Sequence, residues 1–144
     1  MKLSTRTRYG IRAMLELAEN HGEGPLQIKV IANRQDISIK YLEQLMAILR
    51  SGGFVRSIRG PKGGYMLSKV PAQIKLDELF TCLEGPVVTV ECIEDENYCA
   101  RVADCMTRQV WAQVQAAMMK VLQSMTLQDL VNRAKERKNL DYQI

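Results

Sequence analysis

The chain has 144 residues, of which 47% are hydrophobic and 25% are charged. These fractions are typical of a globular domain, and they exclude long disorder, collagen-like repeats and a disulfide-packed miniature. The length leaves room for one domain and an appended element, which argues against a multidomain enzyme. The chain lacks an apolar run of roughly 18 residues, the length that spans a bilayer. It begins with charged residues where a signal peptide would be apolar, so we expect a cytoplasmic protein with no membrane partner.

The net charge of +4 is unevenly distributed along the chain. Residues 1–70 carry 12 Lys and Arg against 5 Asp and Glu, a balance of +7, whereas residues 71–144 carry 8 against 11, a balance of −3. A basic half in a small protein indicates a polyanion partner such as nucleic acid. A solvated basic face would give the same count, so the charge alone leaves both interpretations open.

An amphipathic helix is expected at the start of the chain. Apolar residues recur at three- and four-residue spacing from Thr5 to about Asn20, and Ser4 or Thr5 can accept hydrogen bonds from the first free amides. Two glycines and a proline within residues 21–25 then end the helix and turn the chain.

The next two helices are predicted to form a helix-turn-helix. The first covers residues 26–34, and Ser38 caps the second, whose apolar face ends at Gly52. The corner between them requires a left-handed residue, and Asp36 tolerates that conformation better than most. Ala32 is small enough for the two helices to approach closely. In this motif the second helix enters the DNA major groove.

A β-hairpin follows directly. Residues 54–58 and 64–67 are β-prone, and the turn-rich segment between them carries Arg59 and Lys62. The glycine-rich segment lacks the Gly-Lys-Ser/Thr of a phosphate-binding P-loop, so a wing turn explains it better. We therefore predict a winged helix-turn-helix whose basic tip reaches a minor groove or phosphates.

Candidate DNA-contacting residues lie off the buried face of the second motif helix, on the wing tip and near the amino end of the first helix. A lysine side chain can contact phosphate or guanine, and a glutamine side chain can bind an adenine edge. A glutamate side chain can accept a hydrogen bond from cytosine N4, and a tyrosine hydroxyl can donate one to phosphate. Arg6 is a further candidate for a phosphate clamp. The predicted set is Arg8, Ser38, Lys40, Tyr41, Glu43, Gln44, Arg59 and Lys62.

The second half is expected to contain three helices and a cysteine-bearing loop. A helix over residues 75–83 precedes an irregular acidic stretch, residues 87–104. A long helix over residues 106–124 carries a wide apolar stripe that includes Trp111, which favours subunit pairing. Thr126 caps a last helix over residues 127–137, and the tail after it is expected to fray.

Three segments of the chain resemble one family of bacterial regulators. They are residues 3–9 (LSTRTRY), residues 37–45 (ISIKYLEQL) and residues 59–65 (RGPKGGY). The family is the winged-helix family that includes IscR, CymR and NsrR, and the similarity spans nearly the whole chain. It implies homodimers joined through the long helix, which bind pseudopalindromic double-stranded DNA operators. It also implies that Tyr41, Glu43 and Gln44 help to read bases and that Arg59 enters the minor groove.

Cys92, Cys99 and Cys105 form a C-x6-C-x5-C pattern in the acidic stretch. Three thiolates on one loop can hold a soft metal centre, and a cytosolic chain has little use for structural disulfides. Zinc, reactive thiols and unremarkable cysteines are the alternatives, although zinc usually shows a C-x2-C knuckle. Cys82, within a helical pattern, is expected to be a buried structural thiol.

The pattern resembles the three-cysteine loop of the iron-sulfur members of the family, which CymR-like members lack. That resemblance implies an iron-sulfur cluster of the [2Fe-2S] type on the three cysteines. It also implies a histidine as fourth ligand three residues beyond Cys105, where this chain has Arg108. The fourth ligand stays open between a residue of a partner subunit and the nearby carboxylates Glu91, Glu94, Asp95, Glu96 and Asp104.

Together these observations predict a mainly α fold with a small β-hairpin. Residues 1–84 form the winged helix-turn-helix domain and its following helix, residues 85–105 the cysteine loop, and residues 106–144 the dimerisation and C-terminal helices. The predicted function is a dimeric DNA-binding transcription regulator whose promoter recognition is modulated by an iron-sulfur cluster. The alternatives are a cluster-free, thiol- or partner-controlled regulator of sulfur metabolism and, more distantly, an iron-sulfur electron-transfer protein. An enzyme is not expected, because no triad, nucleotide loop or paired carboxylates occur.

Overall fold

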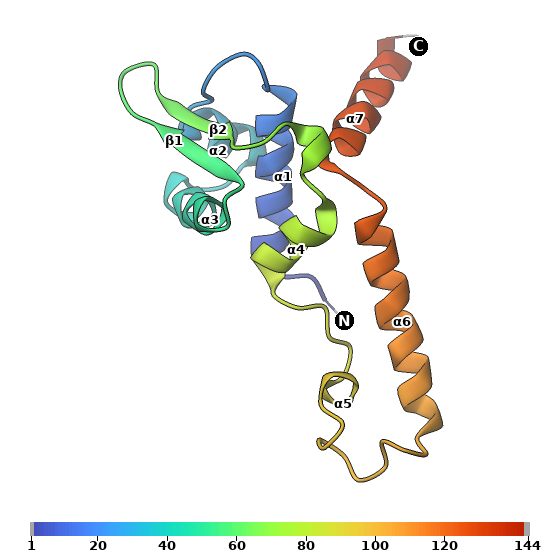
Figure 1. Cartoon of the computed structure of the whole chain (residues 1–144). Coiled ribbons are helices and arrows are strands. Elements are labelled where there is room, and N and C mark those ends of the chain that lie inside the picture. Colours follow the sequence, from blue (N-terminus) through green and yellow to red (C-terminus); the bar gives the residue numbers. More distant parts are fainter. Residues whose placement is uncertain (1, 143–144) are drawn as a thin grey trace.

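The structure is a computed structural model that describes residues 2–142. The fold is mainly helical with one two-stranded antiparallel hairpin, as predicted. The bounds of its elements are α1 Thr5–Glu19, α2 Ile28–Gln35, α3 Ile39–Ser51, β1 Val55–Ile58, β2 Gly64–Leu67, η1 Pro71–Gln73, α4 Leu76–Glu84, α5 Glu91–Glu94, α6 Met106–Gln123 and α7 Leu127–Tyr142. In Figure 1, α1 to α4 and the hairpin form one body; the C-terminal end of α6 lies beside it, and the rest of α6 extends away from it, opposite α5. We call residues 2–84 the winged domain and residues 85–123 the arm.

The helix α1 begins where the sequence predicts it. Ser4 is the N-cap, and its Oγ accepts a hydrogen bond from the backbone N–H of Thr7 at 3.1 Å. The apolar face of α1 supplies Ala13, Met14 and Leu17 to the core of the winged domain, where all three are buried. The cap and the apolar spacing together explain why the chain is helical here.

The helix-turn-helix is present with the predicted corner. Asp36 adopts φ 53° and ψ 49°, the left-handed conformation that the corner requires. Ser38 caps α3, and its Oγ accepts from the Tyr41 N–H at 3.0 Å. Ala32 is buried between the helices. The helix α2 starts two residues later than expected because Leu26 pairs with the wing.

The wing is a short hairpin docked onto the segment before α2. Val55 pairs with Leu67 and Ile58 with Gly64. Outside the hairpin, Leu26 and Tyr65 exchange two backbone hydrogen bonds, of 3.0 and 2.9 Å. A side chain at position 64 would place its Cβ 2.4 Å from the Leu26 carbonyl oxygen, so this close approach requires glycine.

The helix α7 returns to the winged domain instead of extending the arm (Figure 1). Leu127 and Val131 are buried in the core, and the Leu127 N–H donates to the Ile74 carbonyl at 2.9 Å. Thr126 caps the helix as predicted, through a reciprocal pair of hydrogen bonds with Asp129. The prediction of a frayed tail is wrong within the described residues, because α7 continues to Tyr142.

The continuation of α7 has a physical reason. Its neighbour along this stretch is α1, and Lys138 forms a 3.2 Å ion pair with Glu19 of that helix. The pair is half-exposed and contributes modestly, but it lies at the point where fraying was expected.

The arm is built differently. It contains α5, a single turn that the sequence did not predict, and α6, in which none of the 18 residues is buried. Met106, Val110, Trp111 and Val121 of α6 are exposed by 43% or more. No helix within residues 2–142 has the length and apolar character needed to cross a bilayer.

Candidate nucleic-acid interface and cysteine loop

The outer face of α3 carries the side chains predicted to contact DNA. Lys40, Glu43 and Gln44 are exposed, whereas Leu42 and Leu45 on the opposite face are buried. A three- and four-residue spacing puts the three polar side chains on one face of the helix. Ser38 is exposed at the cap, and Tyr41 is half-buried beside them.

The remaining predicted contacts lie on two other elements. Arg59 and Lys62 are exposed in the turn between β1 and β2, and Arg8 is exposed on α1. Arg6 is used within the chain instead of as a free clamp, because its Nε donates to the Leu83 carbonyl at 2.8 Å. The exposed cations thus lie on the turn of the wing, on α3 and on α1.

The three loop cysteines occupy three separate places. Cys92 is half-buried in α5, Cys99 is exposed in the loop, and Cys105 is the half-buried N-cap residue of α6. Among residues 2–142 there is no group of three or more His, Cys, Asp or Glu side chains arranged to hold a metal ion. The predicted gathering of the three thiols is therefore not found in this structure.

Arg108 also does not serve the role implied by the family resemblance. Its guanidinium Nε donates to the Cys92 carbonyl at 3.0 Å, which fastens α5 to the first turn of α6. A guanidinium has no free lone pair and stays protonated, so it cannot replace a histidine ligand. Three separated thiols and a cation do not fit a [2Fe-2S] cluster, which needs four donors around two irons.

Cys105 lies in surroundings that favour a thiolate. Its Sγ is 3.2 Å from the Thr107 hydroxyl. The pKa of Cys105 is lowered chiefly by that hydroxyl and next by the backbone N–H of Arg108, with a smaller contribution from the charge of Arg101. A cysteine at a helix N-terminus is a recognised reactive type. Cys82 differs, because burial raises its pKa and its thiol donates to the Ile48 carbonyl at 3.8 Å.

The first half of the loop is fastened to α6 by one glutamine. The Gln115 Oε1 accepts from the Thr89 N–H at 3.0 Å, and its Nε2 donates to the Glu94 carboxylate at 3.0 Å. The Thr89 hydroxyl also donates to the Trp111 carbonyl at 3.1 Å. The first half of the loop is therefore joined to α6 by side-chain hydrogen bonds.

The other end of the loop begins at a polar cluster on the winged domain. The Glu84 carboxylate accepts from the Ser4 hydroxyl at 2.7 Å and from the buried hydroxyl of Thr7. These hydrogen bonds, led by the one from Ser4, lower the pKa of Glu84. Glu84 thus ties the end of α4, where the loop starts, to the beginning of α1.

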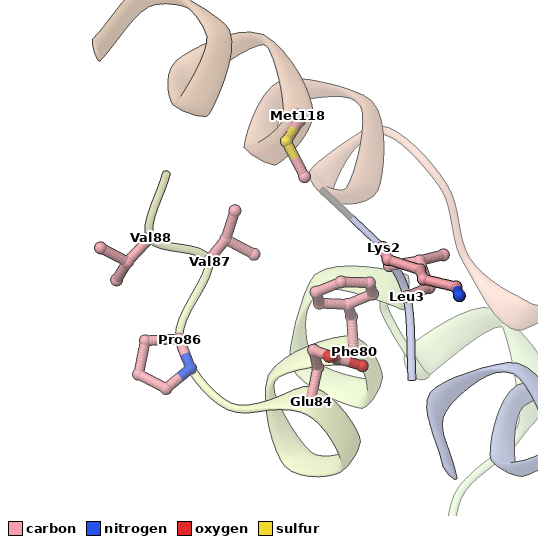
Figure 2. A pocket seen from close by; sticks show the side chains of 8 residues that line it. All are labelled: Lys2, Leu3, Phe80, Glu84, Pro86, Val87, Val88 and Met118. Carbon is pink, nitrogen blue, oxygen red and sulfur yellow. The ribbon is translucent and has the colours of Figure 1, made fainter. Parts of the chain in front are cut away.

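An apolar pocket of about 420 Å³ lies between the arm and the winged domain, beside the direct contact of α6 with α4. Figure 2 shows Met118 of α6 on one side, Phe80 of α4 on the other, and Val87 and Val88 of the loop between them. Leu3 lies beside Phe80. The packing of α6 against the winged domain is therefore incomplete at this pocket.

Sequence reasoning missed the contacts that join these parts. Gln115 interrupts an otherwise apolar stripe on α6, and that interruption was the available signal. Glu84 and Thr7 gave no signal, because they are 77 residues apart and only the fold brings them together.

A helix-turn-helix with a docked wing and an exposed polar face on its second helix defines a DNA-binding protein of the winged-helix class. Comparison with known proteins agrees. Residues 3–133 match the Rrf2 family, described as iron-dependent transcriptional regulators. The chain belongs to the Rrf2 family of DNA-binding transcription regulators.

The chain is similar to regulators named CymR and to regulators named IscR. The regulator CymR of Bacillus subtilis is 44% identical over 92% of this chain and 91% of its own length. The solved structure of CymR, the global cysteine regulator of B. subtilis, matches with a TM-score of 0.78, covering 92% of this chain and 98% of that one. IscR of T. potens matches with a TM-score of 0.79 at 39% identity, covering 95% and 90%. An oxidised form of Staphylococcus aureus CymR matches with a TM-score of 0.75 at 35% identity, covering 91% and 96%.

Proposed function

We propose that this chain is a homodimeric, operator-binding regulator of sulfur metabolism whose affinity for DNA is set by the thiol state of residues 85–105. The observation that carries the proposal is the position of Cys105. It is the residue at the N-cap position of α6, and the loop before it is fastened to the same helix by Gln115 and Arg108. The identity to CymR, somewhat higher than that to IscR, supports control without a resident cluster.

The DNA contacts follow from the exposed face of α3 and from the wing. Lys40, Glu43, Gln44 and Tyr41 would enter a major groove, with Ser38 at the backbone. Arg59 and Lys62 would reach the adjacent minor groove or phosphates, and Arg8 would contact a phosphate. A two-fold dimer would present two such units to a pseudopalindromic site.

The dimer would form through α6. None of the 18 residues of α6 is buried, and four of its large apolar side chains are exposed. An apolar surface of this kind is typical of one that another protein surface buries. A second copy of the same helix offers a surface of the same character, as in an isologous interface. The separation of the two reading helices would then depend on how α6 sits against each winged domain.

The chemical step is a two-electron oxidation by a peroxide. The Cys105 thiolate attacks one peroxide oxygen, the O–O bond breaks, and the hydroxide that leaves takes up a proton to become water. A second loop thiol, Cys99 or Cys92, attacks the resulting sulfenic acid, forming an S–S bond and releasing a second water. Closing that disulfide would pull the loop away from Gln115 and shift α6.

The test uses a duplex that the reduced protein selects from a random-sequence pool. We expect peroxide to lower the affinity for this duplex by about tenfold or more, and dithiothreitol to restore it. With or without peroxide, Cys105→Ser should bind the duplex with the affinity of the dithiothreitol-treated wild type. The matched control Cys82→Ser should lose affinity with peroxide, like the wild type. An affinity that is equal in the reduced and oxidised wild type would overturn thiol control.

An iron-sulfur cluster is the second candidate, favoured by the C-x6-C-x5-C spacing and by the IscR similarity. It would require the loop to gather its thiols and another group to supply the fourth ligand. Protein purified without oxygen should then absorb visible light and contain iron and sulfide, and Cys99→Ala should lose all three. Colourless, iron-free protein would eliminate this candidate.

A further inference from the structure

Two tyrosines connect the first helix to the predicted reading helix. The ring of Tyr9 in α1 and the ring of Tyr41 in α3 have centroids 6.2 Å apart and planes at 88°. This is an edge-to-face contact, in which the positive edge of one ring meets the negative face of the other. Both rings are half-buried and pack against the core on one side.

A cation lies over the first of these rings. The guanidinium carbon of Arg12 is 5.1 Å from the centroid of the Tyr9 ring. Arg12 follows Tyr9 by three residues, so the two side chains share one face of α1. Arg12 is itself exposed, and its charge holds the Tyr9 ring in place through a cation–π contact.

Tyr41 is thus constrained at two points. Its backbone N–H is bound to the Ser38 cap at 3.0 Å, which fixes the first turn of α3. Its ring is held by Tyr9. A side chain already ordered before binding loses less entropy when it contacts a partner, so this arrangement favours discrimination between sequences.

We propose that Tyr9, with Arg12 over its ring, is a positioning residue that sets how well Tyr41 distinguishes one DNA sequence from another. The inference rests on the proposed function, in which Tyr41 contacts bases. Tyr9 itself need not touch DNA. Its contribution should appear in the ratio of specific to non-specific affinity, and not in the charge-driven part of binding.

The experiment compares two duplexes, the one that the wild type selects from a random pool and a scrambled duplex of the same composition. We expect Tyr9→Leu to lower affinity for the selected duplex about three- to tenfold, the range expected for one lost aromatic contact. Affinity for the scrambled duplex should stay within about twofold, and the dependence on salt should not change. Tyr9→Phe should restore the wild-type ratio, because the contact needs the ring and not the hydroxyl.

Arg12→Gln provides a second variant that leaves the core untouched. If Arg12 acts through Tyr9, the affinity ratio should fall by about twofold while the slope of log affinity against log salt is unchanged. The matched control is Arg8→Gln, which removes a predicted phosphate contact and should reduce that slope by about one. Circular dichroism of each variant checks the fold.

The outcomes separate the inference from the proposed function. If the wild type selects no sequence, DNA reading by α3 fails together with the inference. If it does select one and Tyr9→Leu keeps the wild-type ratio, or loses affinity equally for both duplexes, the positioning role is overturned and the proposed function stands. A slope reduced by one in Arg12→Gln would make Arg12 a phosphate contact and remove it from the proposal.

Discussion

Helix α1 of the winged domain and helix α6 of the arm both carry apolar residues at helical spacing, but they bury them to different extents. Six of the 15 residues of α1 are buried, four of them in the hydrophobic core. The 18 residues of α6 contribute none, although valine, methionine and tryptophan recur along the helix. Apolar periodicity therefore predicts that a segment is helical, but it does not predict what covers the apolar face.

The polar contacts of the two regions differ in the same way. In the winged domain, side chains cap helices and join distant elements, as Ser4, Thr7 and Glu84 do. In the arm, Gln115 and Arg108 join the loop to the adjacent helix, while α6 packs on α4 and an apolar pocket lies beside that contact. The winged domain with α7 docked on it should thus be stable without a partner chain, whereas the arm should depend on association.

We expect the largest difference in unfolding free energy between the variants Leu79→Ala and Val121→Ala. Leu79 in α4 is fully buried, so its truncation should cost about 2–5 kcal/mol of unfolding free energy. Val121 in α6 is 54% exposed, and at protein concentrations that keep the chain monomeric its truncation should cost less than about 0.5 kcal/mol. Urea unfolding measures both. Equal losses in dilute protein would mean that the arm is packed as tightly as the winged domain.

Val110→Glu tests whether the apolar face of α6 is the dimer interface. Val110 is 50% exposed on the apolar stripe, and a carboxylate there would be buried without a partner in the proposed dimer. We expect the dissociation constant of the dimer to rise more than about tenfold, with helix content unchanged. Gln113→Glu adds the same charge at an exposed polar position and should associate like the wild type. Sedimentation velocity distinguishes them, and an unchanged dimer in Val110→Glu would place the interface elsewhere.

Much of the winged domain could be predicted from local sequence signals. The left-handed corner at Asp36, the Ser38 cap and the wing turn each depend on residues a few positions apart. The position of α7 could not be predicted, because it rests on the pairing of Leu127 with Ile74 across the fold. The helical extension of α7 was missed because its contact with α1, the Lys138–Glu19 ion pair, also joins residues far apart in the sequence.

In the predicted site, too, features set by local spacing could be predicted, and features set by the fold could not. The exposed face of α3 was predictable because helical spacing alone places Lys40, Glu43 and Gln44 together. The arrangement of the three cysteines could not be predicted. Their spacing along a loop shows which thiols are available, but it does not show how the loop folds. Cys105 as the cap of α6 and the Tyr9–Tyr41 contact appear only in three dimensions.

Glu84→Gln should show the smallest effect, at the boundary between the two regions. The charged Glu84 accepts hydrogen bonds from Ser4 and Thr7, and its pKa in the folded chain is lowered. At neutral pH we expect the amide to cost about 1 kcal/mol of unfolding free energy, a modest value because the site is partly open to solvent. Thermal unfolding of the variant and of Glu78→Gln, an exposed position on the same helix, measures the cost.

The pH dependence of this cost has a definite sign. A group whose pKa is lowered by folding stabilises the folded state above its unfolded pKa, which for glutamate is about 4.3. That stabilisation is lost as the pH falls through the lower, folded pKa. The gap between wild type and Glu84→Gln should therefore be full at neutral pH and close as the carboxylate becomes protonated in acid. A gap that stays constant down to about pH 3 would show that Glu84 acts through its shape and not its charge. In that case the link between α1 and the start of the arm would not depend on pH.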